Sequence, residues 1–235
     1  MKCSINSIFR ATEGEGTRLG TPQIFVRFQG CNVGCVNCDT MESWEFGEKY
    51  HQDIEDVLDQ IREISRLSGN LMNASITGGD PLHPKNVPGA LEVARRLKSE
   101  GYFISLEAAG TRVVDSIFDV IDFISFDYKT ISTGVRTNPE LIVKLIDQYY
   151  GKFQLKTVIV NNQDFEDTLR VYESIKATRP GKHFPWCLTP SYEAGEEFPR
   201  ERFLNVVKLN EQTCGKFLVV GQQHKWLHGP DVQDV

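Results

Sequence analysis

Short apolar runs alternate with amphipathic stretches along the chain. Several runs are rich in Val, Ile and Phe, which is typical of strands buried on both faces of a parallel sheet. They predict strands over 24–28, 71–77, 103–107, 123–126, 153–160, 184–188 and 217–220. Apolar positions with helical spacing predict helices over 54–64, behind Asp53 as N-cap, and over 88–98, 139–149, 164–177 and 199–212.

Alternating strands and helices with short connections predict right-handed βαβ units and a mostly parallel sheet. With 235 residues, the chain is too short for eight such units and a long N-terminal loop. We therefore predict an α/β fold, an incomplete (βα) barrel formed by residues 1–235 as a single domain. In such sheets, ligands bind beyond the carboxyl ends of the strands.

Composition narrows the class of protein. Hydrophobic residues at 40% and charged residues at 25% are ordinary for a globular protein, and a net charge of −6 argues against nucleic acid as a partner. The sequence has neither a signal-peptide pattern nor an apolar run long enough for a membrane span, so we expect a cytoplasmic protein without a membrane partner. In that compartment, the six cysteines are expected to bind metal or do redox chemistry rather than form disulfides.

The strongest motif directly follows the strand predicted at 24–28. Cys31, Cys35 and Cys38 place three thiols within eight residues, with no fourth cysteine nearby. Most [4Fe–4S] clusters have four Cys ligands, so three leave one iron open to chelate an amino and a carboxylate group. The Cys-x3-Cys-x2-Cys spacing resembles that of the radical S-adenosylmethionine (SAM) superfamily.

A structural zinc site is the alternative for this motif, with Cys3, Cys187 or Cys214 as fourth ligand. Zinc knuckles usually present paired Cys elements, and this sequence has no second pair. The isolated cysteines are expected to be small buried hydrophobes.

Polar residues follow three further predicted strands. The segment Thr77-Gly78-Gly79-Asp80-Pro81 resembles the Gly-Gly-Glu-Pro motif with which the superfamily holds the SAM amino group, although it is also ordinary turn chemistry. Glu107 ends one strand, and Asp127 and Lys129 end another. Buried Glu and Lys are rare unless they are paired or functional, so these residues form either a ligand site or a salt bridge.

The N-terminal stretch indicates one family within the superfamily. Glu13-Gly14-Glu15-Gly16, Arg27 before the cysteines, Cys38-Asp39-Thr40 and the later Gln222-Gln223-His224-Lys225 resemble the 7-carboxy-7-deazaguanine synthase family. The resemblance covers most of the chain. It implies substrate contacts at Thr12, Glu13, Gly14, Arg27, Thr77 and His224. It implies SAM contacts at Asn37, Cys38, Asp39, Gly78, Gly79, Asp80, Glu107, Asp127, Lys129 and Pro190. The implied metal ligands are Cys31, Cys35 and Cys38 for a [4Fe–4S] cluster and Thr40 for Mg²⁺.

The resemblance also implies a reaction. A 5′-deoxyadenosyl radical takes a hydrogen atom from 6-carboxy-5,6,7,8-tetrahydropterin, the ring contracts, ammonia leaves and 7-carboxy-7-deazaguanine forms for queuosine synthesis. The implied partners are this pterin, a flavodoxin-like or other reductant, and a second copy of the chain in a homodimer. The residue types agree, since the Arg27 fork suits a carboxylate and the hard Thr40 hydroxyl oxygen suits Mg²⁺.

Four features depart from the family pattern: Asn37, Asp80, the Glu107-Ala108-Ala109 segment and the Asp127-Tyr128 pair. These departures remove no cluster ligand. They leave open the hypothesis that the chain is a homologue that acts on a related pterin or purine. A glycyl-radical-enzyme activase is the second enzyme hypothesis, although it gives no reason for Glu13 and Arg27. A non-catalytic zinc module is the hypothesis from another class.

Overall fold

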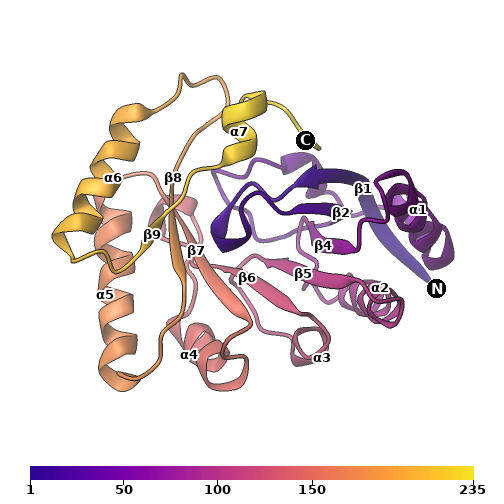
Figure 1. Cartoon of the computed structure of the whole chain (residues 1–235), viewed down its shortest axis with the longest axis horizontal. Helices are drawn as coiled ribbons and strands as arrows, with labels where there is room; N and C mark the ends of the chain where they lie inside the picture. The colour runs from indigo at the N-terminus through magenta and orange to yellow at the C-terminus, as the bar shows by residue number, and fades with distance from the viewer.

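A single open sheet of nine strands organises the chain in this computed structural model, which describes residues 1–235 (Figure 1). The strand order is β3-β1-β2-β4-β5-β6-β7-β8-β9, and the two edge strands do not pair with each other. The strands are β1 (Lys2–Thr12), β2 (Pro22–Phe28), β3 (His51–Asp53), β4 (Asn73–Gly78), β5 (Phe103–Ala108), β6 (Phe123–Asp127), β7 (Phe153–Ile159), β8 (Trp186–Pro190) and β9 (Leu218–Val219). The predicted incomplete barrel is confirmed.

The sheet is parallel from β2 through β9, whereas β1 pairs antiparallel with both β2 and β3. All seven predicted strands are present, and β8 begins two residues later than predicted. The sequence pattern missed β1 and β3. β1 is mostly half-buried and its pairing register with β2 shifts between Ile5 and Ser7, so its apolar residues do not form a continuous run.

The helices are α1 (Ile54–Leu67), α2 (Val87–Ser99), α3 (Asp115–Phe118), α4 (Pro139–Gln148), α5 (Asn162–Thr178), α6 (Arg200–Gln212) and α7 (Gln223–His228). The five predicted helices are confirmed, and the two short ones, α3 and α7, were not predicted. Asp53 precedes α1 as expected, but its side chain makes no capping hydrogen bond. Asn161 does cap α5, in a reciprocal capping box with Asp164.

Helices α1 to α6 lie along the outside of the curved sheet, whereas α7 and the C-terminal residues lie over its open mouth (Figure 1). The core lies between the outer face of the sheet and these helices, with Val26, Phe28, Ile76 and Leu106 fully buried. Because strand residues alternate between faces, their neighbours Arg27, Thr77 and Glu107 point to the concave side. The fold therefore lines its concave side with polar groups.

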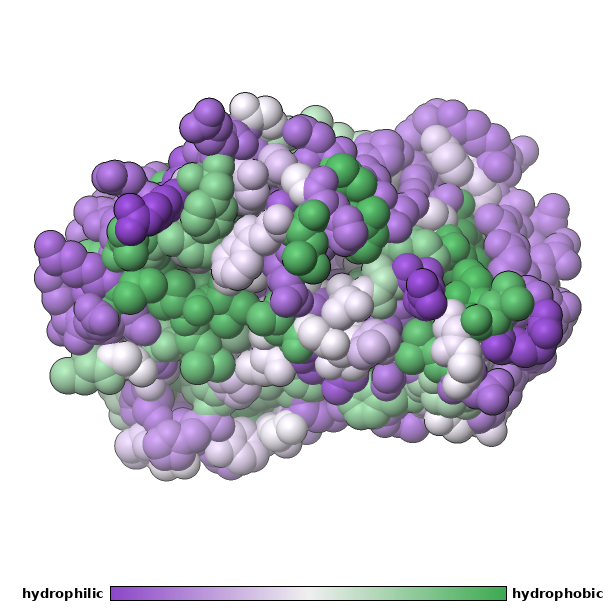
Figure 2. All heavy atoms as spheres, turned by 45° about the horizontal axis from the view of Figure 1, so that its top comes forward, coloured by the Kyte–Doolittle hydropathy of each residue, from purple (hydrophilic) through white to green (hydrophobic).

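Apolar residues also reach the surface at the C-terminal elements. Figure 2 shows apolar surface on both halves of one face, with the broader area on the left and hydrophilic residues around it. Phe198, Leu204, Trp226 and Leu227 are among the exposed large apolar side chains. None of the helices is both long enough and apolar enough to span a bilayer.

Candidate functional site: a cavity at the carboxyl ends of the strands

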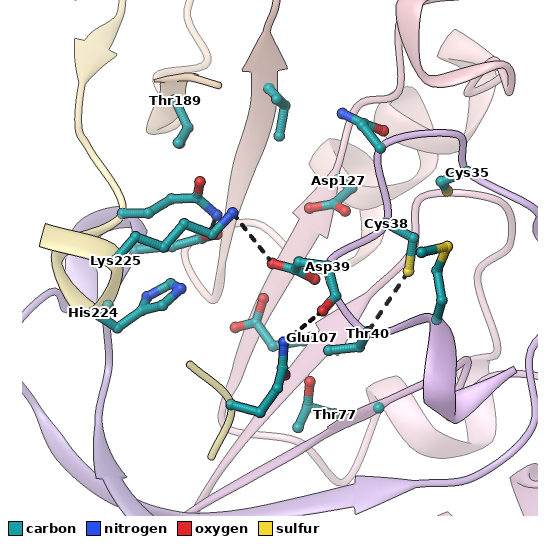
Figure 3. A pocket seen from close by; sticks show the side chains of 18 of the residues that line it. Cys35, Cys38, Asp39, Thr40, Thr77, Glu107, Asp127, Thr189, His224 and Lys225 are labelled. Atoms are coloured by element: carbon teal, nitrogen blue, oxygen red, sulfur yellow. Dashed lines mark hydrogen bonds and ion pairs between the residues drawn. The ribbon is translucent and has the colours of Figure 1, made fainter. Parts of the chain in front are cut away.

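A cavity of about 630 Å³ opens on the concave side of the sheet, beyond the carboxyl ends of its strands (Figure 3). Nearly all residues expected to contact ligands line it. They are Thr12, Glu13, Gly14, Arg27, Cys31, Cys35, Asn37, Cys38, Asp39, Thr40, Thr77, Gly78, Gly79, Glu107, Asp127, Lys129 and His224. Segments spread over most of the chain thus meet at one place, as expected for a site at the end of a parallel sheet.

The cysteine loop forms one wall of this cavity. Cys31, Cys35 and Cys38 are unpaired and half-buried, so three thiols are available as ligands. The Cys38 sulfur accepts a hydrogen bond from Trp44 Nε1 at 3.2 Å, and the Cys31 sulfur accepts one from the Val33 amide at 3.4 Å. Such N–H donors stabilise sulfur that carries negative charge, as thiolate ligands do.

The three sulfurs are not yet gathered around one point. Nowhere do three Cys, His, Asp or Glu side chains approach closely enough to hold a metal ion. In the close-up, the Cys35 side chain lies apart from that of Cys38 (Figure 3). The donor set fits a [4Fe–4S] cluster by number and chemistry, and the thiols must converge when the cluster binds.

The root of the cysteine loop is held by the glycine pair after β4. Gly78 has a φ of +126°, and a Cβ there would lie 2.2 Å from the Phe28 carbonyl oxygen. The amides of Gly79 and Asp80 donate to the carbonyls of Phe28 and Gly30 at 3.0 and 3.1 Å. Close packing against the cysteine loop thus requires Gly78, in addition to any approach to a ligand.

Asp80 and Pro190, two of the expected SAM contacts, do not line the cavity. The Asp80 side chain is buried and accepts a hydrogen bond from the Leu82 amide at 3.0 Å, while its Oδ2 lies 3.7 Å from Arg112. Burial raises the pKa of this carboxyl, against the opposing charge of Arg112. Asp80 therefore supports the turn from beneath. Pro190 is buried at the end of β8, between Thr189 and Ser191, which do line the cavity.

The end of β6 faces the cysteine loop. Lys129 Nζ forms an ion pair with Asp127 Oδ2 at 3.0 Å, and its side chain is only 13% exposed. Burial would lower the pKa of Lys129, but the neighbouring Asp127 and Cys35 raise it above the ordinary value. A charged ammonium therefore stands beside Cys35, where it can stabilise an anionic ligand or the thiolate itself.

Asp39 and Thr40 lie between the cysteine loop and the C-terminal residues. The only hydrogen-bond partner of the Thr40 hydroxyl is the Cys38 sulfur, at 3.7 Å. Its oxygen is therefore free to bind a hard cation. The Asp39 carbonyl accepts a hydrogen bond from Gln233 at 2.7 Å, and Lys225 lies 3.8 Å from its carboxylate. This oxygen-rich corner fits Mg²⁺ better than the soft cluster iron.

Arg27 projects into the cavity from β2. Its Nη2 pairs with Asp234 Oδ1 at 3.0 Å, and its guanidinium carbon lies 5.3 Å from the centre of the Phe9 ring. Its Nε is buried without a partner, so the guanidinium fork is only partly satisfied. A planar carboxylate is the ligand that would satisfy the whole fork.

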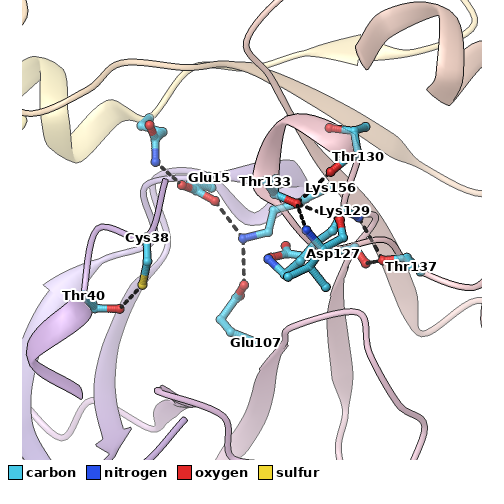
Figure 4. Close-up of polar contacts among 12 residues, drawn as sticks. Glu15, Cys38, Thr40, Glu107, Asp127, Lys129, Thr130, Thr133, Thr137 and Lys156 are labelled. Atoms are coloured by element: carbon cyan, nitrogen blue, oxygen red, sulfur yellow. Dashed lines mark hydrogen bonds and ion pairs between the residues drawn. The ribbon is translucent and has the colours of Figure 1, made fainter. Parts of the chain in front are cut away.

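A charged network forms the floor of the cavity (Figure 4). Lys156 Nζ contacts Glu15 at 2.7 Å and Glu107 at 2.8 Å. Burial would raise the pKa of Glu15, but Lys156, His224 and a hydrogen bond from Gln222 lower it to about 2. Burial and the neighbouring carboxylates of Glu13 and Glu15 raise the pKa of Glu107 to about 7, although the charge of Lys156 lowers it. Glu15 is therefore the more firmly ionised of the two.

Helix α7 covers the cavity next to the Gly-Glu-Gly loop. The Gln223 amide donates to the Gly14 carbonyl at 2.9 Å, and a Cβ on Gly14 would lie 2.1 Å from His224 Nδ1. Burial lowers the pKa of His224, so its imidazole is neutral near pH 7 and offers one donor and one acceptor. Gly14 is thus needed for His224 to lie over this loop.

Four further cavity residues, Trp44, Lys156, Gln222 and Asp234, were not among the expected site residues. Lys156 had a signal in the sequence, because a charged residue inside a buried strand must be paired or functional. No sequence signal predicted the hydrogen bond of Trp44 to Cys38 or the ion pair of Asp234 with Arg27, since both depend on how distant segments fold together.

Known proteins are similar to this chain in sequence and in fold. The sequence profile of the family described as "Radical SAM superfamily" matches residues 25–188. The 7-carboxy-7-deazaguanine synthase of Methanospirillum hungatei is 31% identical over 182 residues, which cover 76% of this chain and 68% of that protein. The synthase of Aquifex aeolicus is 25% identical over 224 residues, which cover 94% and 92%. The crystal structure of QueE from Escherichia coli has a similar fold, with a TM-score of 0.69, 22% identity and 95% of each chain covered.

The protein is therefore a radical SAM enzyme, with a [4Fe–4S] cluster and SAM as the cofactors of its superfamily. Within that superfamily, the chain belongs to the 7-carboxy-7-deazaguanine synthase family. The family match favours the synthase over an activase or a zinc module.

Proposed function

We propose that the enzyme converts 6-carboxy-5,6,7,8-tetrahydropterin into 7-carboxy-7-deazaguanine, with loss of ammonia, as a carbon–nitrogen lyase. The observation that carries this proposal is the partly satisfied Arg27 fork, which shares one cavity with the three-thiol loop. The fork suits the substrate carboxylate, and the proposed contacts to the ring are Thr12, Glu13, Gly14, Thr77 and His224, all of which line the same cavity. Queuosine synthesis is the proposed destination of the product.

Cluster, SAM and Mg²⁺ each have a group of residues suited to them. When bound, the cluster and SAM supply the radical that removes hydrogen from the substrate. Cys31, Cys35 and Cys38 would hold the cluster, and Thr40 would contribute to Mg²⁺ binding. The residues proposed to contact SAM are Asn37, Cys38, Asp39, Gly78, Gly79, Asp127 and Lys129 along the cavity wall, with Asp80 and Pro190 acting from behind it.

The whole chain is proposed to act as one radical SAM domain, since a single sheet connects all of its strands. A flavodoxin-like or other reductant would supply the electron for SAM cleavage. We also propose a homodimer, because Leu204, Trp226 and Leu227 are exposed apolar residues of α6 and α7. Sedimentation of the purified protein tests the dimer.

The proposed reaction is tested by incubating the reconstituted protein with SAM, a reductant, Mg²⁺ and the carboxytetrahydropterin. We expect mass spectrometry to detect 7-carboxy-7-deazaguanine and one released ammonia per turnover. Formation of 5′-deoxyadenosine without the deazapurine would show an active radical SAM enzyme with another substrate, and would overturn the proposed function.

Replacing Thr40 by Val is expected to lower turnover of the pterin about tenfold, because it removes a hydroxyl ligand at nearly constant volume. Cluster content should stay normal, because the Cys38 sulfur keeps its hydrogen bond from Trp44. Iron analysis and a Mg²⁺ titration of the rate measure both effects. Thr213→Val, outside the cavity at the end of α6, is the control. An unchanged Mg²⁺ dependence would remove Thr40 from the metal site.

Replacing Asp234 by Asn is expected to lower the KM for the pterin by roughly two- to fivefold. The substrate carboxylate must take the place of Asp234 on Arg27, and a partly exposed ion pair is worth about 0.2–1 kcal/mol. Asp56→Asn is the control, since Asp56 is an exposed acidic residue of α1 that does not line the cavity. Steady-state kinetics with varied pterin measure the change, and a KM raised by Asp234→Asn would mean that Asp234 assists binding.

A further inference from the structure

Two acidic side chains contact a single ammonium group on the floor of the cavity, and a third acidic side chain lies beside them. Glu15 comes from the connection between β1 and β2, Glu107 from the end of β5, and Lys156 from the middle of β7 (Figure 4). Glu13 lies beside them and is 8% exposed. The exposed fractions of the other side chains are 12% for Lys156, 19% for Glu15 and 21% for Glu107. One cation thus faces more negative charge than it can neutralise.

The partners of the individual oxygens show which carboxylate is available to a ligand. Glu13 accepts hydrogen bonds from the Glu15 amide at 3.1 Å and from Gln23 at 2.7 Å, one on each oxygen. Glu15 accepts from Lys156 on Oε2 and from Gln222 on Oε1, both at 2.7 Å. Glu107 accepts only from Lys156, on Oε2 at 2.8 Å. No hydrogen bond reaches its Oε1 from the protein, and Glu107 lines the cavity.

The position of Glu107 is set by Lys156. A carboxylate at the end of a strand can rotate about its terminal bonds, and the bond to Lys156 is the only side-chain hydrogen bond of Glu107. Lys156 is itself held from the other side by Glu15, which Gln222 holds in turn. Removing the ammonium would leave buried carboxylates without a counterion, which is costly in a protein interior.

This network adjoins the residues near the cysteines, because Lys156 is paired with Asp127 in the register of β6 and β7. It joins Glu107 to Glu13 and Glu15 of the Gly-Glu-Gly loop, whereas Asp127 and Lys129 form their own ion pair beside Cys35. The family resemblance implied that Glu107 contacts SAM. Its partner Lys156 also binds Glu15, which belongs to the same loop as the expected substrate contacts Glu13 and Gly14.

We propose that Lys156 is a positioning residue that holds Glu107 so that Oε1 accepts a hydrogen bond from the substrate. The matching group is the cyclic guanidine edge of the pterin, which presents N–H donors at one end of the molecule. Arg27, which lines the same cavity from β2, is left for the substrate carboxylate. The proposal rests on the proposed function and adds a specificity determinant to it.

The test uses the reconstituted holoenzyme with steady-state kinetics at varied pterin. Lys156→Gln is expected to raise the KM for the pterin about tenfold or more, with a smaller effect on kcat, as when a hydrogen bond to a charged group is lost. Lys156→Arg, which keeps the charge, should restore a large part of the binding. Lys144→Gln is the matched control, because Lys144 pairs with Asp115 at 2.7 Å outside the cavity, and its KM should equal that of the parent.

A double-mutant cycle separates positioning from a general structural effect. Glu107→Gln alone should raise the KM about as much as Lys156→Gln, and the two changes together should add less than about twofold to either. Additive effects, or an unchanged KM in Glu107→Gln, would overturn the proposal. If Lys156→Gln does not fold, Glu107→Gln and Lys156→Arg still decide it. A parent enzyme that makes no deazapurine refutes the proposed function, whereas a productive parent with an unaffected Lys156→Gln variant refutes only the role of Lys156.

Discussion

Protein carrying Cys35→Ala is expected to be colourless after anaerobic reconstitution and unable to cleave SAM. The parent protein should be brown and hold about four irons per chain. With one iron left for SAM, the other three need all three thiols of the loop, so the loss of one ligand removes the cluster. Iron and sulfide analysis, the visible spectrum and the yield of 5′-deoxyadenosine measure the result.

No other cysteine can replace the lost ligand. Cys3 and Cys187 are buried, and burial raises the pKa of each thiol to about 11, so both resist ionisation. Cys214 is exposed, so the expectation of a buried thiol was wrong for this residue, and it does not line the cavity. Cys214→Ala is therefore the matched control, and it should keep a full complement of iron. Persistent SAM cleavage by Cys35→Ala would refute the cluster assignment.

The positions of the expected site residues follow from a regular rule. Each parallel strand ends at the same edge of the sheet, so polar residues after successive apolar runs must come together there. This rule brought Arg27, Thr77, Glu107 and Asp127 into one cavity from strands far apart in the sequence. It also explains why most strands could be predicted, since buried parallel strands are continuous apolar runs.

The same rule does not say which polar residues contact one another. Asp80 looked like a ligand contact by its place in a motif, yet its backbone and side chain support the turn below the cavity. Glu107 belongs to the network of Lys156 and Glu15, which depends on how the connection between β1 and β2 enters the barrel. Such contacts between distant segments have no periodic signal in a single sequence.

The contacts of the segment that follows α7 could not be predicted from the sequence either. Its residues 230–235 line the cavity, and Asp234 reaches Arg27 across 207 positions of sequence. A short polar segment without periodicity predicts only a loop or a terminus. Its contact matters for the chemistry, because it shows the Arg27 site already occupied by a carboxylate.

Arg27→Lys is expected to weaken binding of the pterin by roughly 1.5–3 kcal/mol, the scale of a hydrogen bond to a charged group. On the KM this corresponds to roughly a 10- to 150-fold increase. Val26 and Phe28 are fully buried on the packed face of β2, so Arg27 must point into the cavity, as the alternation of the strand predicted. Its guanidinium has a free buried Nε beside the Nη2 that holds Asp234, which leaves room for two parallel hydrogen bonds to a carboxylate.

Lysine keeps the charge but loses this fork, so the change isolates geometry from electrostatics. Slow cleavage of SAM without substrate should persist, because Arg27 contacts none of the three cysteines that would hold the cluster. Arg10→Lys, an exposed position on the neighbouring strand β1, is the matched control and should leave the KM unchanged. Kinetics at varied pterin and varied SAM distinguish the two sites, since only the pterin KM should rise. Equal turnover of the pterin by Arg27→Lys and the parent would mean that the carboxylate binds elsewhere in the cavity, and would remove the observation on which the synthase assignment rests.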